Sequence, residues 1–523
     1  MVVKRSSKKS KSRAAEFLQK PRGVIQPRVQ KVGPEHFGII SVDCAKARSK
    51  WMLADFYGKV LVPPTEVAHN RLELDAMVAQ VRAALVAHDI RDCLVAVERT
   101  GRYHHTVKDA FAKAGFETRT VHPFATKQFR QPANPDNKTD DTDLGAIHRV
   151  AVNGFALSET TPTIAWRELQ LAVRHRRDLV RKSSALACQI REHLDAALPG
   201  YAACFDKLWD SNVARPLVRQ FGSAQALCAQ GVLGLSQFLR HQQIRFQQRT
   251  LDTVLAWAAT AAAPDLAADY HRQIGLAYVD DHDRKSQEIL VLERDIAHRL
   301  VQTPYILLLS TPGVNVVSAA EFAGEMGPIE NYANPRTITG RAGLFPSRYQ
   351  SDRVDHANGP LVRRANRALR AAILLIADNL IVCNDHFGAL ASRWRVAGKD
   401  PRATHVKVAV RFCRIAYHMV AGRQVFHHPC LRTRSYILEK VIAFHVEHQT
   451  PCKEYLQDLN YAINQIPQKE HAAEAKPLAD RLQEVQDRGR KGPQPLSEII
   501  PIVLARLGIG VIPSTPSGDP DLT

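Results

Sequence analysis

The chain has 523 residues, of which 45% are hydrophobic and 24% are charged, the composition of an ordinary globular protein with material for several domains. No apolar run is long enough to span a membrane and the N-terminus has no apolar signal-peptide core, so we expect no membrane association. The formal net charge of +19 favours a polyanionic partner, with nucleic acid ahead of an acidic membrane surface.

The nine cysteines are scattered along the chain, and their number is odd. None of them forms a C-x-x-C pair, which disfavours a zinc ribbon and a disulfide framework. This usage is typical of a reducing compartment, so we expect a cytoplasmic protein that is associated with the nucleoid if its partner is DNA.

Residues 1–35 are rich in lysine and arginine, mixed with serine and proline. Such a composition cannot bury an apolar core, so it predicts a disordered basic arm that can lie along phosphates. An inert solvated tail explains the same composition equally well.

Residues 36–160 alternate between short apolar runs and helical patterns, and they open with two runs joined by a turn. This alternation predicts a mixed α/β sheet that begins with a hairpin. The expected strands cover residues 37–43, 51–57, 60–62, 93–98 and 118–121, and the expected helices cover residues 66–88 and 104–114.

Four acidic residues stand where this architecture would bring them together. Asp43 and Glu98 close two of the expected strands, and ligands gather at the carboxyl edge of such sheets. Asp140 and Asp143 begin a further helix, and their spacing puts them on one face of it. Four carboxylates in one place suit Mg²⁺, which prefers oxygen ligands and, in pairs, can clamp a phosphodiester. The alternatives are a helix-dipole role for the two aspartates and a solubility role for the two strand ends.

From residue 161 to about residue 300 the pattern becomes helical, with apolar positions at helical spacing and many arginines between them. We expect a helical region that contains a basic coiled-coil hairpin. The basic side chains either face a duplex or an RNA, or they form an ordinary solvated helix face.

Residues 301–430 predict a mainly helical domain with one loop that contains glycine and serine, residues 340–352. A second run, residues 359–370, predicts a helix whose Arg363, Arg367 and Arg370 share a face, and such a face suits a phosphate backbone. Residues 431–523 predict a helical extension that ends in a disordered tail.

Several of these segments together resemble the DEDD transposases of the insertion-sequence 110 family, which are related to Piv-type DNA recombinases. The resemblance lies in Ile40-Ser41-Val42-Asp43, Val97-Glu98-Arg99-Thr100-Gly101, His122-Pro123 and Lys138-Thr139-Asp140 with Asp143. It implies an N-terminal RNase H-like (RuvC-like) nuclease domain over residues 36–160 and a mainly α C-terminal transposase domain over residues 301–430. The residues that would bind Mg²⁺ or Mn²⁺ are Asp43, Glu98, Asp140 and Asp143.

The same resemblance places a catalytic serine in the loop of residues 340–352. The matching position is Ser351, which would attack a DNA phosphodiester, although Asp352 stands where the family commonly has glycine. Ser347 is the weaker candidate. Basic side chains near these segments are expected to bind nucleic acid, namely Lys138, Arg348, Arg363, Arg367 and Arg370.

The expected function is that of a transposase or DNA recombinase, which cuts and rejoins DNA at the ends and at the target of an insertion element. The resemblance also implies a noncoding bridge RNA as a guide and assembly into a homodimer or homotetramer. The alternative function is an RNase H-like, structure-specific endonuclease of the junction-resolvase type, in which water is the nucleophile and Ser351 takes no part.

Overall fold

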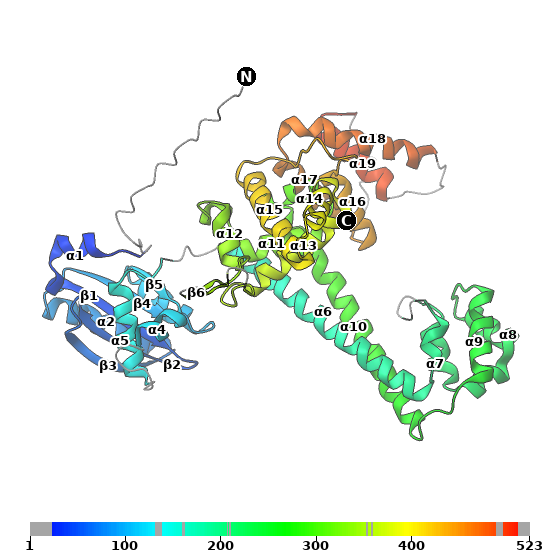
Figure 1. Ribbon diagram of the computed structural model, residues 1–523, viewed down its shortest axis with the longest axis horizontal. Coiled ribbons are helices and arrows are strands. Elements are labelled where there is room, and N and C mark those ends of the chain that lie inside the picture. The colour runs from blue at the N-terminus through cyan, green and yellow to red at the C-terminus, as the bar shows by residue number, and fades with distance from the viewer. Residues whose placement is uncertain are drawn as a thin grey trace, which may run out of the picture. The chain divides into compact units, whose positions relative to one another are not determined.

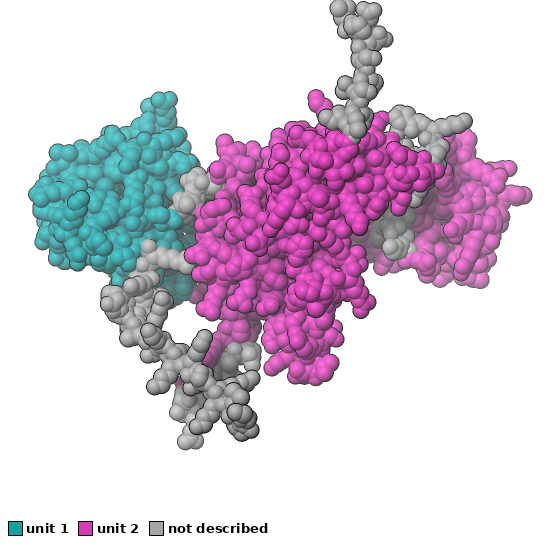
Figure 2. Space-filling model, turned by 90° about the horizontal axis from the view of Figure 1, so that it is seen from above, with its two compact units in different colours: residues 1–161 teal, residues 162–523 magenta. Residues whose placement is uncertain are grey.

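The structure is a computed structural model, shown as a ribbon in Figure 1. It describes residues 23–130, 139–158, 163–206, 208, 211–351, 354–356, 359–487 and 495–510. The chain divides into two compact units, residues 1–161 (unit 1) and residues 162–523 (unit 2), which Figure 2 shows in different colours. Each unit has hydrophobic clusters of its own.

Unit 1 contains a five-stranded sheet with the strand order β3-β2-β1-β4-β5. The strands β1 (Phe37–Cys44), β2 (Arg48–Asp55) and β3 (Val60–Ala68) are antiparallel neighbours. The strands β4 (Asp92–Glu98) and β5 (Thr118–Val121) extend the sheet from β1 in parallel. The prediction of a mixed α/β sheet that opens with a hairpin is confirmed.

The strand β3 is longer than the sequence predicts. We expect it to end before Pro63 and Pro64, but it continues through both prolines to Ala68. Because β3 is an edge strand that pairs only with β2, its free side has no ladder bonds that a proline could break. Two register shifts between β2 and β3 accompany this pairing.

Helices cover both faces of the sheet. On one face, α2 (Arg71–Ala87) and α3 (His104–Lys113) pack their apolar side chains against β1 and β4. On the other face, α1 (Gln26–Val32) and α5 (Asp140–Val152) do the same. Successive side chains of a strand point to opposite sides, so alternate residues of β1 pack into the hydrophobic clusters on the two faces of the sheet.

Two helices of unit 1 differ from the expectation. The helix α1 lies inside residues 1–35, and Val29 is buried in it, so the predicted disordered arm is wrong for this part. Residues 1–22 lie outside the described residues. The helix α4 (Pro123–Arg130) follows β5, packs on α5 and was not predicted, although a proline suited to a first helical turn was the available signal.

In unit 2, α6 (Ile164–Ala197) and α10 (Ala268–Leu300) lie side by side along most of their length (Figure 1). Their direction is antiparallel, because Glu168 pairs with Arg299 near one end and His193 contacts His271 near the other. The predicted helical region is therefore confirmed, while supercoiling of the pair stays a prediction.

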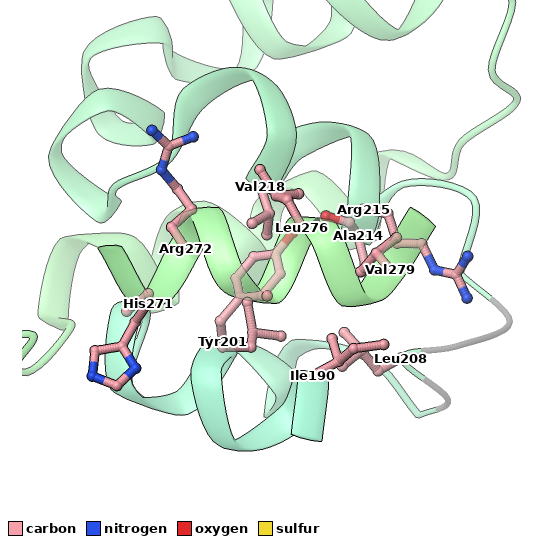
Figure 3. Close-up of a pocket in the computed structure, with 13 residues that line it drawn as sticks. Ile190, Tyr201, Leu208, Ala214, Arg215, Val218, His271, Arg272, Leu276 and Val279 are labelled. Carbon is pink, nitrogen blue, oxygen red and sulfur yellow. Dashed lines mark hydrogen bonds between the residues drawn. The ribbon is translucent and has the colours of Figure 1, made fainter. Parts of the chain in front are cut away.

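Three helices, α7 (Ala214–Phe221), α8 (Ala224–His241) and α9 (Gln248–Thr260), pack at the end of this pair. An apolar cavity of about 30 Å³ lies between α6, α7 and α10 (Figure 3). Beside this cavity, the Tyr201 hydroxyl donates a hydrogen bond of 2.9 Å to the carbonyl of Ala214. This cavity is a gap in the core of the helical end and carries none of the predicted site residues.

Three arginines of α6 are used inside unit 2. Arg174 pairs with Glu325, and Arg176 and Arg177 both pair with Glu321, at N–O distances of 2.7 to 3.0 Å. Burial acts to raise the pKa of Glu325, but the hydrogen bonds that it accepts outweigh burial and hold this pKa below its ordinary value. These three arginines therefore hold α6 on the interior of unit 2. The sequence had left open two other roles for the basic side chains of this region, a surface for a duplex or an RNA and a solvated helix face.

The rest of unit 2 is a helical body with one large hydrophobic core. This core draws side chains from α6 and α10, from the helices before residue 430 and from the helices after it. The helices are α11 (Val316–Met326), α12 (Pro335–Ala342), α13 (Arg367–Cys383), α14 (Asp385–Val396), α15 (Pro401–Ala421), α16 (Ile437–Glu447), α17 (Cys452–Gln465), α18 (His471–Asp487) and α19 (Pro495–Arg506). The described part of the predicted extension is thus helical and belongs to the body.

One predicted helix is wrong in its extent. We expect a helix over residues 359–370, but α13 begins only at Arg367. Asn366 is its N-cap, and the Asn366 side chain accepts a hydrogen bond of 3.0 Å from an amide of the first turn. Arg363 therefore stands in the preceding connection and shares no helix face with Arg370.

None of the described helices is by itself long and apolar enough to cross a membrane. Within the described part of the chain, one pair of helices, α13 and α14, is together long and apolar enough, but the pair is bent by 93°. All nine cysteines carry free thiols.

Candidate active site

Two acidic side chains end neighbouring parallel strands of unit 1. Val42 of β1 pairs with Val97 of β4, so the residues that follow them, Asp43 and Glu98, stand level at the carboxyl edge of the sheet. Glu98 is 8% exposed and Asp43 is half-buried. The buried apolar residues before them fix both strands in the core, and this holds the two carboxyl groups at one place.

The first turn of α5 contributes the other two predicted acids. Thr139 caps the helix: its hydroxyl accepts a hydrogen bond from the amide of Thr142, and the Thr142 hydroxyl accepts one from the amide of Thr139. The helix packs on β1 and β4. Asp143 is buried, with 4% exposure, whereas Asp140 is exposed.

Two of these carboxyl groups, those of Asp43 and Asp143, act on a third, that of Glu98. Burial raises the pKa of Glu98 to about 7, and the charges of Asp43 and Asp143 and a hydrogen bond with Asp43 act in the same direction. The side chain of Thr126 opposes them. Asp43 is therefore within hydrogen-bonding reach of Glu98, and Asp143 is near enough for its charge to act on Glu98.

Arg130 supplies one positive charge to this cluster of acids. It is the last residue of α4, and its guanidinium forms a short ion pair with Asp143. Both side chains are largely buried, with 12% and 6% exposure. The Arg130 Nε atom has no hydrogen-bond partner among the described residues. Arg130 was not predicted from the sequence, because the pair joins two helices and no local pattern marks it.

Asp140 stands apart from the three buried acids. Lys50 of β2 is level with Asp43 across the antiparallel pair of strands, and its ammonium group pairs with Asp141 at 2.6 Å. The bond to Asp141 raises the pKa of Lys50, and the charge of Asp140 adds to this effect. The structure thus brings three of the four predicted acids together and places Asp140 in solvent beside Lys50.

The chemistry of this cluster fits a divalent cation, although its present arrangement does not form a metal site. Carboxylate oxygens are the ligands that Mg²⁺ prefers, and a bound cation would relieve the repulsion that acts on Glu98. Across the described residues, no three His, Cys, Asp or Glu side chains are placed to hold one ion. A metal ion would have to compete with Arg130 for Asp143.

The predicted serine lies in unit 2 at the end of a short hairpin. The strand β6 (Tyr349–Ser351) pairs with β7 (Val354–His356), and Ser351 is the last residue before the turn. Ser351 is exposed, whereas the hydroxyl of Ser347 donates a hydrogen bond to the carbonyl of Pro360 at 3.0 Å. Ser347 therefore helps to close the loop. Residues 352 and 353, which follow Ser351, lie outside the described part of the chain.

The basic residues predicted to bind nucleic acid have different surroundings. Three of them are exposed: Arg348, Arg363 and Arg367. Arg370 is turned inward and donates hydrogen bonds to the carbonyls of Ala342 and Val362, and burial lowers its pKa. Lys138 lies outside the described residues. A phosphate contact by Arg370 would require these internal bonds to break, so its role stays a prediction.

Two segments of the chain match known protein families. Residues 40–199 match the transposase family DEDD_Tnp_IS110, and residues 305–392 match the Transposase IS116/IS110/IS902 family. The chain belongs to the IS110 family of transposases. No individually curated protein matches this IS110-family transposase.

The two matches contain the two sets of predicted site residues. The first match contains all four acids, and the second contains Ser351 and the four described arginines of the predicted nucleic-acid site. An IS110-family transposase binds DNA, cleaves it and rejoins it, and a DEDD domain suggests dependence on a divalent metal. The second match ends within α14, so α15 and the helices that follow lie beyond it.

Proposed function

We propose that this IS110-family transposase moves an insertion element by metal-dependent cleavage and rejoining of DNA, with Ser351 as the nucleophile. The observation that carries the proposal is the convergence of Asp43, Glu98 and Asp143 at one edge of a mixed sheet, inside a DEDD transposase match. Ligands gather at this edge in α/β sheets. We assign the domain of residues 36–160 to the RNase H-like (RuvC-like) class on the same grounds.

Metal binding in this proposal uses the carboxylates of unit 1. Mg²⁺ or Mn²⁺ held by Asp43, Glu98, Asp140 and Asp143 would polarise the scissile phosphate and stabilise the charge that develops on it. Metal ligands bind in their ionised form. Because the pKa of Glu98 is raised to about 7, neutral and higher pH should favour binding. Arg130 already pairs with one oxygen of Asp143 and would compete with the metal for it.

The covalent step in this proposal conserves phosphodiester bonds. The Ser351 hydroxyl loses its proton as its oxygen bonds to phosphorus, one bond from phosphorus to a deoxyribose oxygen breaks, and that oxygen takes up a proton. A hydroxyl of another DNA strand then attacks the phosphoserine, forms a new phosphodiester and restores the serine. Rejoining therefore needs no ATP. The exposure of Ser351 beside a hairpin turn supports this role.

The partners in this proposal are DNA, a noncoding bridge RNA and further copies of the chain, assembled as a dimer or tetramer at the nucleoid. The net charge of +19 and the exposed Arg348, Arg363 and Arg367 support contacts with phosphates. Such contacts position a protein on nucleic acid without reading its sequence, which leaves target choice to a guide.

A nicked suicide substrate, from which the short cleaved end diffuses away, tests the serine. The wild-type protein with Mg²⁺ should accumulate a protein–DNA adduct that survives heating in detergent. Ser351→Ala should form no adduct and transfer no strand, yet should bind DNA as the wild type does. Ser347→Ala is the matched control, and it should still form the adduct because its hydroxyl only closes the loop.

Other outcomes would change the assignment. Cleavage by Ser351→Ala without an adduct would identify water as the nucleophile and favour the junction-resolvase alternative. Glu98→Gln and Asp143→Asn should stop cleavage under either mechanism, because both remove a negative metal ligand. Undiminished cleavage by both of these variants would refute the proposed metal site.

A further inference from the structure

A run of exposed positive side chains lies on α14, on α15 and in the turn between them. They are Arg393, Arg395, Lys399, Arg402, Lys407, Arg411 and Arg414. None of the seven forms an ion pair with any residue that the structure describes. These side chains therefore keep their full charge toward solvent.

The sequence around them supplies almost no compensating charge. Residues 386–438 contain two lysines and eight arginines against a single acidic residue, Asp400. The carboxylate of Asp400 is already engaged, because it caps α15 by accepting hydrogen bonds from the amides of Arg402 and Ala403 at 2.8 and 3.1 Å. Within this stretch of sequence, therefore, no second acid offsets the positive charge.

The arginines of α6 provide the comparison within the same unit. Arg174, Arg176 and Arg177 also come from a basic helix, but each pairs with a buried glutamate. Those charges hold the fold together. The cations of α15 have no such use in the fold, and unpaired charge of one sign on a surface typically serves an external partner.

Three of the seven cations form a stripe along α15. Lys407, Arg411 and Arg414 are spaced by four and three residues, so they lie on one face of the helix and span about 10 Å of its axis. The Lys407 ammonium lies 5.5 Å from the centre of the Trp394 ring, which fixes its position over α14. We call Lys407, Arg411 and Arg414 the α15 stripe.

Side chains of α14 add to the positive field at the α15 stripe. The rings of His386 and His428 lie 3.8 Å apart, and burial together with the charges of His428, Arg411 and Arg393 lowers the pKa of His386 to about 4. Arg393 and Arg411 therefore act on the same imidazole, although they belong to different helices. Positive charge from two helices converges at this point.

We propose that the α15 stripe is a binding surface for the phosphodiester backbone of nucleic acid, separate from the predicted contacts of Arg348, Arg363 and Arg367. Three cations in line along about 10 Å cover the length that three to four phosphates of one strand occupy, since these follow one another at about 3.4 Å along a duplex axis. The surface lies beyond the matched family segment, which ends at residue 392. The proposal deepens the proposed function, on which it rests.

Salt-dependent binding of the full-length protein tests the α15 stripe. A 30-base-pair DNA duplex and an RNA duplex of the same sequence are titrated at salt concentrations from about 50 to 200 mM. The variant with Lys407→Ala, Arg411→Ala and Arg414→Ala should bind at least about tenfold more weakly and should lose about two to three units of slope in the plot of log affinity against log salt.

A control variant changes the net charge equally without touching the stripe. Lys182→Ala, Arg219→Ala and Arg284→Ala remove three other exposed cations of unit 2, each of which is paired with an aspartate. This variant should keep nearly all of the salt slope. A charge-retaining variant, Lys407→Arg with Arg411→Lys and Arg414→Lys, should also bind as the wild type does.

The outcomes separate this proposal from the serine assignment. Loss of slope with DNA alone, with RNA alone or with both identifies the bound nucleic acid and supports the proposal. Unchanged affinity and slope with both duplexes, or an equal loss in the control variant, overturns it. If the alanine variant is unstable by thermal denaturation, glutamine at the same three positions replaces it and is judged by the same criteria. Ser351→Ala should keep the wild-type slope of log affinity against log salt, whether or not the α15 stripe binds nucleic acid.

Discussion

Arg130 is the positive charge that accompanies the buried carboxylate of Asp143. Asp143 also has acidic neighbours, because the charges of Asp143 and Asp43 both raise the pKa of Glu98. An arginine placed in this way stabilises the acids when no metal is bound. It also competes with a metal for one of the proposed ligands, so Arg130 couples the stability of unit 1 to metal binding.

Arg130→Ala should therefore destabilise the metal-free protein by about 2 to 4 kcal/mol, because it leaves a buried carboxylate unpaired. Added Mg²⁺ or Mn²⁺ should raise the unfolding temperature of this variant more than that of the wild type. Thermal denaturation in EDTA, followed by metal titration, measures both effects. Lys50→Ala removes the exposed pair with Asp141 and should have a smaller effect. Wild-type behaviour of Arg130→Ala in EDTA would contradict this interpretation.

Glu474 of α18 gives unit 2 a dependence on pH. Its carboxylate is fully buried and accepts a hydrogen bond from the amide of Leu438 at 3.1 Å, at the start of α16. Burial raises its pKa from 4.5 to about 7, although this bond favours the ionised form. At a pH between these two pKa values, Glu474 is protonated in the folded state and ionised in the unfolded state. Its contribution to the free energy of unfolding therefore falls as pH rises from about 4.5 to about 7.

Glu474→Gln should remove that contribution. Between pH 5 and pH 8, the wild type should lose about 1 to 3 kcal/mol of stability relative to the variant. Urea denaturation at the two pH values measures the difference. Glu484→Gln changes an exposed glutamate of the same helix and should leave the wild-type pH dependence in place. A pH dependence in Glu474→Gln equal to that of the wild type would exclude Glu474 as its source.

Among the helices, α6 and α15 show that a basic pattern has more than one structural outcome. Both helices place arginines between apolar residues, and the sequence alone does not separate them. The difference comes from α11, whose buried Glu321 and Glu325 receive the arginines of α6. Such partners lie 144 to 151 positions away in the chain, so no local pattern reveals them.

Arg176→Ala should weaken the attachment of α6 to the body of unit 2. It removes bonds to two acids, Glu293 at 2.6 Å and Glu321 at 3.0 Å, and should cost about 2 to 4 kcal/mol in the free energy of unfolding. Arg181→Ala, at an exposed position of the same helix, should leave stability almost unchanged. Chemical denaturation compares the two. If Arg176→Ala were stable but bound nucleic acid weakly, the arginines of α6 would face a ligand after all.

The elements of the sheet were the most predictable part of the fold. The strands with Asp43 and Glu98 at their carboxyl ends and the helix that begins at Asp140 are confirmed, although β1 runs one residue beyond Asp43. Each of these elements combines an apolar period with a clear end signal. The helix expected over residues 359–370 was too long. Its basic residues are compatible with a helix, but the chain becomes helical only after Asn366, which is the N-cap of α13. In that case a side-chain hydrogen bond decided the boundary.

The site was predictable in part for a related reason. Parallel pairing of β1 and β4 follows from the order of elements, and it places Asp43 beside Glu98. The burial of Asp143 and the exposure of Asp140 depend on how α5 rotates on the sheet, which spacing does not determine. The position of Arg130 depends on α4, which was not predicted. Metal binding, the role of Ser351 and the guide RNA stay predictions.

At the scale of the whole molecule, two units with separate hydrophobic clusters make up the chain. Each unit should therefore unfold as a cooperative structure of its own, and calorimetry of the full-length protein should show two transitions. Arg130→Ala should lower the transition of unit 1 and Arg176→Ala that of unit 2. A single transition that both variants shift by similar amounts would show that the units unfold together.

The hydrophobic core of unit 2 also sets a limit on how the enzyme can be dissected. The family match stops at residue 392, yet Phe412, Ile442 and Ile500 are as deeply buried as anything inside the match. A fragment that ends at the family boundary would lack these side chains, would expose to water the apolar residues of the match that they cover, and should precipitate. A shorter fragment that contains the hairpin of β6 and β7 with Ser351 must therefore include the helices as far as Arg506 in order to fold.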